Sequence, residues 1–245
     1  MVSAQAQVRV VKRLDAFHSI DNKTDFDIGL IDRGVSGTVT IEGHKNAVGL
    51  VTASSKEGIL FLSMEKPRNW LPRLPFFNAR LEVRHSPQVS VASRGLTSIR
   101  TSGTGTITVE GLRFRDLKIE NSGDGNLRFI RCRFYSLEVL LKGNGTISFD
   151  RGDSLDTRLQ VEGDGSILAH SLRTKNLAAR VFGKGRITGY PRELLNAKVT
   201  GKGAVLYRGN PVSVEKETAE GGRVDKYLEI DSSEVEPASG SGDRR

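Results

Sequence analysis

The segment LKIENSGDGNLRFIRCRFYSLEVLLKGNGTISF (117–149) contains two copies of one pattern, twenty residues apart. In each copy, apolar and polar residues alternate on both sides of a Gly-x-Gly triplet. Four steps of 20 residues and one of 18 separate the triplets that begin at Gly103, Gly123, Gly143, Gly163, Gly183 and Gly201. A fixed period of this length predicts that the chain stacks one short structural unit.

Alignment on the triplets places apolar residues in columns. The column after the glycines holds Ile107, Leu127, Ile147, Ile167 and Ile187. The column before them holds Ile99, Ile119, Val139, Leu159 and Ala179. Alternation with a period of two predicts a strand on each side of every turn, with one face buried. Equivalent residues recur at one spacing and in one orientation, so the prediction is an all-β solenoid, a parallel β-helix with coils of about 20 residues.

Two further features of the coils follow from the pattern. The pairs Leu112/Phe114 and Cys132/Phe134 predict a third short side. The glycines are expected to be turn residues with positive φ, and the variable residue between them is expected to face solvent. A phosphate-binding loop would need a helix after the glycines, whereas a strand is predicted after every triplet.

The sequence divides into three parts. Residues 1–13 are predicted to be a flexible N-terminal segment, 14–213 the β-helix domain, and 214–245 an acidic, largely disordered C-terminal tail. Within the domain, residues 24–62 resemble looser coils of the same kind. Residues 64–78 form an insert rich in proline and aromatic residues that interrupts the pattern.

The insert contains Trp70, Phe76 and Phe77. We interpret it as a lid that covers an open side of the solenoid. The alternative is an exposed interaction loop built on these three aromatic side chains.

Composition indicates the charge of the expected partners and bears on disulfide bonds and transmembrane segments. The chain of 245 residues has a net charge of +8. Residues 215–245 contain nine acidic and five basic residues, so the preceding part is more basic than the whole and favours anionic partners. The single Cys132 excludes an internal disulfide bond, and no apolar stretch is long enough for a transmembrane segment.

The N-terminus leaves the compartment open. Ala4 and Ala6 resemble the end of a secretory signal, but an apolar segment does not precede them. The cell envelope, either periplasm or outer surface, is therefore expected if an export signal was removed, and otherwise the localisation is open.

Several segments together resemble the auto-transporter adhesin head, or GIN, domain family. They are 117–129, 137–149, AARVFGKGRITG (178–189), AKVTGKGAVLYRGNP (197–211), FHSIDNKTDFDIGLIDR (17–33) and ARLEVRHSPQVSVASRG (79–95). The similarity covers about residues 14–213, and the closing Val-x-Tyr-x-Gly-x-Pro at 205–211 is its most specific part. This resemblance implies a right-handed parallel β-helix that is often exported, has no recognised catalytic residues, and has an expected role in adhesion or envelope binding.

Catalytic, cofactor and metal sites are not expected. The four histidines are scattered, and no His or Cys pair has metal-ligand spacing. Cys132 lies in an inward column and is expected to be a small buried residue rather than a reactive thiol. One enzyme alternative remains, a polysaccharide lyase or hydrolase that uses carboxylates at the corner formed by Asp150, Asp153 and Asp156.

One outward feature favours a binding function. Basic residues gather after the second strand of successive coils, at Arg113, Arg115, Arg131, Arg133, Arg151, Arg173 and Lys175. Arg113, Arg133 and Arg173 share one column. We expect this ridge to dock an acidic polysaccharide or lipopolysaccharide, although a solvated charged face is an open alternative. Nucleic acid is disfavoured because no aromatic residues punctuate the ridge for base stacking.

The sequence therefore predicts a non-catalytic, adhesin-type binding module. A purely structural part of a larger assembly is the other alternative. Self-association through the ends or edges of the solenoid is also expected, because an unpaired strand edge can pair with a second copy.

Overall fold

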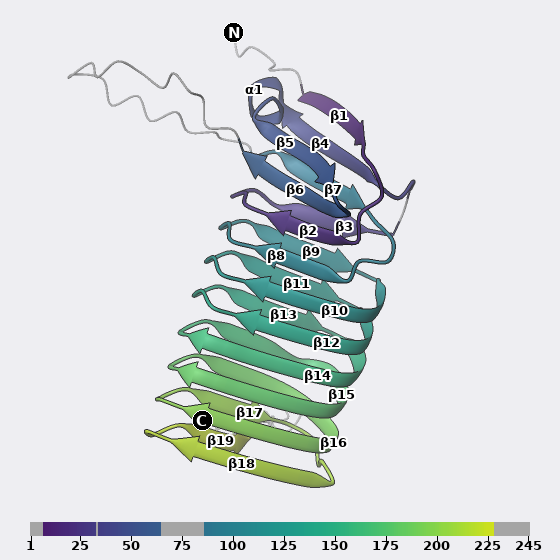
Figure 1. Cartoon of the computed structure of the whole chain (residues 1–245). Coiled ribbons are helices and arrows are strands. Elements are labelled where there is room, and N and C mark those ends of the chain that lie inside the picture. Colours follow the sequence, from purple (N-terminus) through teal and green to yellow (C-terminus); the bar gives the residue numbers. More distant parts are fainter. Residues whose placement is uncertain (1–6, 33, 65–85, 228–245) are drawn as a thin grey trace, which may run out of the picture.

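The computed structural model describes residues 7–32, 34–64 and 86–227. These residues form one elongated stack of β-coils, with β1 and the short helix α1 (Lys45–Val48) at one end and β18 and β19 at the other (Figure 1). The N-terminal strands are β1 (Gln7–Arg13), β2 (Ser19–Asn22), β3 (Ile28–Ile31), β4 (Thr38–His44), β5 (Val51–Lys56), β6 (Ile59–Met64) and β7 (Gln88–Ala92). The repeating coils contain β8 (Ser98–Thr101), β9 (Thr106–Glu110), β10 (Arg113–Asn121), β11 (Asn126–Ile130), β12 (Arg133–Leu141), β13 (Thr146–Asp150), β14 (Gly152–Gly163), β15 (Ser166–Gly183), β16 (Arg186–Thr200), β17 (Ala204–Tyr207), β18 (Ser213–Ala219) and β19 (Arg223–Lys226).

The parallel register confirms the twenty-residue coil. Leu127 lies opposite Ile107 on one side and Ile147 on the other, and Ile119 lies opposite Ile99 and Val139. The first of these columns runs through the whole stack as Val10, Ile41, Val89, Ile28, Ile107, Leu127, Ile147, Ile167, Ile187, Val205 and Val224. Each fully buried aliphatic side chain contributes about 1.5–3 kcal/mol, so the stacking of coils supplies the hydrophobic core.

Aromatic side chains stack in the core where the third short side follows β11 and β13. Phe114 lies over Phe134 with ring centroids 5.4 Å apart, and Phe129 lies over Phe149 at 5.0 Å. Leu112 and Cys132 are buried in the same part of the core. The predicted third side is therefore packed against the core. Its buried residues hold in place the strand segment that carries the outward residues Arg113 and Arg133.

The N-terminal region differs from the prediction of looser coils. β2 and β3 do form a coil that stacks in parallel on β8 and β9, with Ile20 opposite Ile99 and Ile28 opposite Ile107. However, β4 runs antiparallel to β1 and β7, and β5 runs antiparallel to β6. β6 and β7 add a further layer in parallel on β2 and β3, so only β1, β4 and β5 form an antiparallel cap over this end of the solenoid.

The solenoid extends past both boundaries that the sequence predicted. β1 lies within the segment 1–13 that was expected to be flexible, and it adds an antiparallel strand to β4. β18 and β19 lie at and beyond the predicted start of the tail and pair in parallel with β16 and β17. The short alternating stretches in these segments hydrogen-bond to an existing sheet edge, which charge composition alone does not reveal.

The last coil carries a charge where the earlier coils are apolar. Lys216 lies opposite Ala197 in the column of Ile119 and Val139. Its ammonium group donates a hydrogen bond to the carbonyl of Val224 at 3.0 Å and lies 5.1 Å from the centre of the Tyr207 ring. Inward-pointing charges of this kind oppose further strand addition. Self-association through this end stays a prediction, and Lys216 makes such pairing less favourable.

The glycine triplets need a different explanation from positive φ. Among their first glycines only Gly163, Gly183 and Gly201 have positive φ, and none of the second glycines does. Instead, a Cβ on Gly143 would lie 2.0 Å from the carbonyl oxygen of Gly123 in the preceding coil. The residue between the glycines is exposed in every triplet, as predicted. The glycines therefore allow neighbouring coils to approach closely, and the triplets have a structural role.

Candidate functional site: the arginine corner

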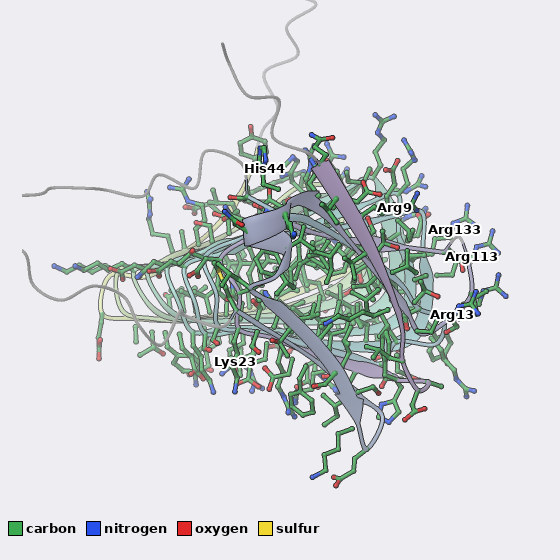
Figure 2. All side chains as sticks on the ribbon, turned by 90° about the horizontal axis from the view of Figure 1, so that it is seen from above. Arg9, Arg13, Lys23, His44, Arg113 and Arg133 are labelled. Carbon is green, nitrogen blue, oxygen red and sulfur yellow. The ribbon has the colours of Figure 1, made fainter. Side chains whose placement is uncertain are left out.

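The predicted basic ridge lies where β11 and β13 end and β12 and β14 begin. We call this region, residues 111–116, 131–136, 151–156 and 171–175, the arginine corner. Viewed along the solenoid axis, Arg113 and Arg133 project from the same side of the molecule as Arg9 and Arg13 of β1 (Figure 2). Phe114 of β10 and Phe134 of β12 are buried in the core. Because side chains alternate along a strand, their neighbours Arg113 and Arg133 are directed outward.

Two of the arginines have an unusual backbone conformation. Arg131 has φ 53° and Arg151 has φ 56°, whereas the corresponding turn of the preceding coil has Gly111 at φ 71°. A residue with a Cβ is disfavoured there by about 1–2 kcal/mol. Such outliers gather at functional sites, where the strain is compensated elsewhere.

The column of Arg113 and Arg133 is less uniform than predicted. Its members across successive coils are Arg113, Arg133, Asp153, Arg173 and Tyr190. Asp153 thus separates Arg133 from Arg173, and its carboxylate accepts from the Arg173 guanidinium at 2.9 Å. The alignment of Arg173 with Arg113 and Arg133 is confirmed, but its charge is partly neutralised.

The remaining cations differ in their pairing. Arg131 pairs with Glu110, Lys175 with Glu193 at 3.3 Å, and Arg115 with its neighbour Asp116 at 3.8 Å. No ion pair within the described part of the chain involves Arg113, Arg133 or Arg151. These three guanidinium groups give the corner its uncompensated positive charge.

A groove of about 620 Å³ occupies the corner between the coils. It is lined by Arg131, Cys132, Arg133, Arg151, Gly152, Asp153, Ser171, Arg173, Tyr190 and Arg208. At its far end, the Arg208 guanidinium lies 4.5 Å from the centre of the Tyr190 ring. Arginine stacked on an aromatic ring is held in place and keeps its charge at the surface.

Tyr190 and Arg208 were not predicted from the sequence as residues of this site. Between β15 and β16 the register shifts between Leu168 and Arg173 and again between Thr174 and Asn176. Tyr190 therefore lies opposite Arg173 although only seventeen residues separate them. The available signal was the shortened 18-residue step of the last triplet.

The three carboxylates of the enzyme alternative are engaged separately. Asp150 pairs with Arg128 at 2.8 Å, Asp153 pairs with Arg173, and Asp156 accepts a hydrogen bond from the Asn176 amide at 2.8 Å. Paired-carboxylate hydrolysis needs two carboxyl groups that flank one substrate bond. The observed contacts explain these residues as partners of neighbouring side chains.

The thiol of Cys132 lies under the corner and is 2% exposed. It is directed toward the carbonyl oxygens of Val109 and Ile130, at 3.6 and 3.5 Å. Burial raises the pKa of the Cys132 thiol, which keeps it in the unreactive protonated form. Cys132 is therefore a packing residue, as expected.

Residues 7–32, 34–64 and 86–227 contain no group of three His, Cys, Asp or Glu side chains that could hold a metal ion. None of their helices is long and apolar enough to cross a membrane. The insert side chains Trp70, Phe76 and Phe77, and all of residues 64–78 except Met64 of β6, lie outside the described residues.

The model of the family described as "Putative auto-transporter adhesin, head GIN domain" matches residues 16–211. The chain belongs to this family. The resemblance of its repeats to GIN domains is thereby confirmed, and the matched range ends at the closing Val-x-Tyr-x-Gly-x-Pro segment. No curated protein matches the chain significantly.

Solved structures support the fold of this GIN domain. A putative adhesin from Bacteroides fragilis NCTC 9343 has 24% sequence identity and a TM-score of 0.77, with 91% of this chain and 98% of that chain covered. A putative adhesin from Parabacteroides distasonis ATCC 8503 has 18% identity and a TM-score of 0.68, with 91% and 98% covered. A structure from the same strain described as a putative lipid binding protein has 16% identity and a TM-score of 0.65, with 91% and 97% covered.

Proposed function

We propose that this GIN domain is a non-catalytic, adhesin-type binding module whose arginine corner docks an anionic glycan, either an acidic polysaccharide or lipopolysaccharide. The observation that carries the proposal is the set of three guanidinium groups without ion pairs among the described residues: Arg133 and Arg151, which line the groove, and Arg113, which lies one coil earlier. Arginine recognises carboxylate and phosphate groups through paired hydrogen bonds. The cell envelope is the compartment in which such a module would meet this ligand.

The charge distribution around the corner supports a specific surface rather than general solubility. On the neighbouring broad face of the solenoid, Lys118 pairs with Glu138 at 2.8 Å and Lys142 with Glu120 at 3.0 Å. These pairs compensate part of that face, on which Arg158 and Arg180 have no ion pair among the described residues, whereas the corner gathers Arg113, Arg133 and Arg151 around one turn of successive coils. An anionic polymer is attracted where the positive potential is not cancelled locally.

The lipid-binding description of one structural relative does not lead to the same proposal for this chain. Five of the ten residues that line the groove at the corner are arginines, and the groove is open to solvent. A lipid chain needs an apolar cavity. The outward charges therefore favour a polar, anionic ligand.

Serine substitutions test the proposal. The variant with Arg113, Arg133 and Arg151 changed to Ser should bind polygalacturonate or lipopolysaccharide at least about tenfold more weakly at low salt, because charge-assisted hydrogen bonds are lost. The matched control changes Arg158, Arg180 and Lys184 to Ser, which removes the same charge outside the corner. Equal losses in both variants, or no loss in either, would contradict the proposal.

The same samples separate binding from catalysis. Polygalacturonate incubated with the unaltered protein should develop no new reducing or unsaturated ends. Release of such ends that stops on substitution of Asp150, Asp153 or Asp156 would favour the polysaccharide-active enzyme instead.

A further inference from the structure

We infer that the ligand of the arginine corner is a linear acidic polysaccharide that lies parallel to the solenoid axis and contacts about five successive coils. This inference rests on the proposed function and adds the orientation, the length and the linear character of the ligand. Three features of the described residues carry it: the spacing of the cations, the succession of two grooves along the corner, and the ion pairs on the broad face beside it.

The cations follow the axis because each belongs to a different coil. Arg113 lies opposite Arg133, Arg133 opposite Asp153, Asp153 opposite Arg173, and Arg173 opposite Tyr190. Neighbouring strands of a sheet are about 4.8 Å apart. The sugar units of an extended acidic polysaccharide advance by a similar distance, so one charged unit can lie beside each coil, with Arg151 as the cation of the coil that carries Asp153.

The hollow surface continues along the same line. The larger groove extends from Arg131 and Arg133 to Tyr190 and Arg208. A smaller groove of about 200 Å³ lies one coil earlier and is lined in part by Arg94, Gly111 and Arg113. Arg113 of the smaller groove lies opposite Arg133 of the larger one, so the two grooves follow one another along the corner, and we call this line the track.

The ion pairs on the broad face beside the track disfavour other orientations of the polysaccharide. A chain that turned onto the broad face would meet the pairs Lys118–Glu138 and Lys142–Glu120, whose carboxylates repel an anion. Farther along that face, Lys198 is paired with Glu217 at 2.6 Å. These carboxylates make the broad face less favourable than the corner for a polyanion, although Arg158 and Arg180 also lie on that face.

The length of the track sets the length of the ligand. From Arg113 to Arg208 the register advances by five coils. Five strand spacings correspond to about 24 Å. Tyr190 and Arg208 are the last lining residues at one end, and Arg94 at the other end is paired with Asp32 at 3.4 Å. An oligomer of about five or six charged units should therefore fill the stretch from Arg113 to Arg208.

Oligogalacturonates of two to ten units test the inference by calorimetry at low salt. Affinity should rise by at least about tenfold between two units and six, because linked contacts reinforce one another, and should change little beyond six. The double variant with Arg113 and Arg133 changed to Ser should move the plateau to about four units. The control variant with Arg158 and Arg180 changed to Ser should leave the plateau unchanged.

The outcomes separate this inference from the proposed function. If two units bind as tightly as six, or if the control variant shortens the plateau equally, an anion binds but does not lie along the axis, and the inference is wrong. If no oligomer of any length binds, and lipopolysaccharide does not bind either, the proposed function itself fails.

Discussion

The two ends of the short strands β11 and β13 use the same twenty-residue period for opposite purposes. At one end, the glycine triplets bring successive coils so close together that a β-carbon does not fit. At the other end, the turn residues Arg131 and Arg151 carry long charged side chains on a backbone that favours glycine. One edge is thus built for close stacking, whereas the other departs from the residue that its backbone prefers.

The glycine edge also satisfies its own polar groups. The fully buried Asn121 accepts a hydrogen bond from the Gly123 amide at 3.0 Å and donates one to the Gly125 carbonyl at 2.9 Å. The corner instead leaves guanidinium groups directed toward solvent. Repetition alone therefore does not mark a functional site in a solenoid. A residue that departs from the one its local backbone favours is the more informative signal of such a site.

The largest expected effect belongs to the glycine edge. Gly143→Ala should lower the free energy of unfolding by about 3 kcal/mol or more, because the added methyl group meets the rigid backbone of the preceding coil. The matched control is Gly95→Ala, whose Cβ would have no atom within 4 Å and whose cost comes only from its φ of 74°, about 1–2 kcal/mol. Urea denaturation measures both, and equal losses would show that the close approach of the coils is unimportant.

A smaller effect on stability, together with a loss of binding, is expected at the corner. Arg151→Gly should leave the free energy of unfolding unchanged or raise it by up to about 1 kcal/mol, since glycine relieves the strain at φ 56°. The same change should weaken polygalacturonate binding several-fold. Glu220→Gly relieves a similar φ of 57° at another turn and should leave binding intact. A clear loss of stability in Arg151→Gly would mean that this arginine serves the fold.

The smallest effect is expected on the broad face between the two edges. The hydrogen bond and charge of Lys142, with Arg100 and Lys118 nearby, lower the pKa of Glu120. A lowered carboxyl pKa contributes stability above the ordinary pKa of about 4.5, and this contribution disappears as the pH falls through the folded-state value. Glu120→Gln should therefore be slightly less stable than the unaltered protein at pH 6, and the difference should shrink steadily as the pH is lowered below 4.5. A difference that does not depend on pH would contradict this assignment.

The sequence predicted the repeating part of the fold well because the period, the apolar columns and the turns all agree there. Ile147 needs only its neighbours at twenty-residue spacing to define its place in the core. The same reasoning failed for β4 and β5, because alternating apolar residues are equally suited to parallel and antiparallel pairing. It failed also for the φ angles of the triplets, since the close contact that requires glycine comes from another coil.

The candidate site was predicted in part. The ridge arginines and the interposed Asp153 could be aligned by period, but the ion pair of Asp153 with Arg173 depends on side-chain reach. Tyr190 and Arg208 were missed because the register shifts between β15 and β16. Local irregularities of this kind change which residues meet, while the hydrophobic period continues across them.

Hydrogen–deuterium exchange with and without polygalacturonate tests the distinction between the two edges most directly. Our account predicts slower exchange of backbone amides at residues 131–136, 151–156 and 171–175 when the polymer is bound, with no change at the glycine triplets. Protection centred on the triplets, or spread evenly around the coils, would contradict the assignment of binding to the arginine corner.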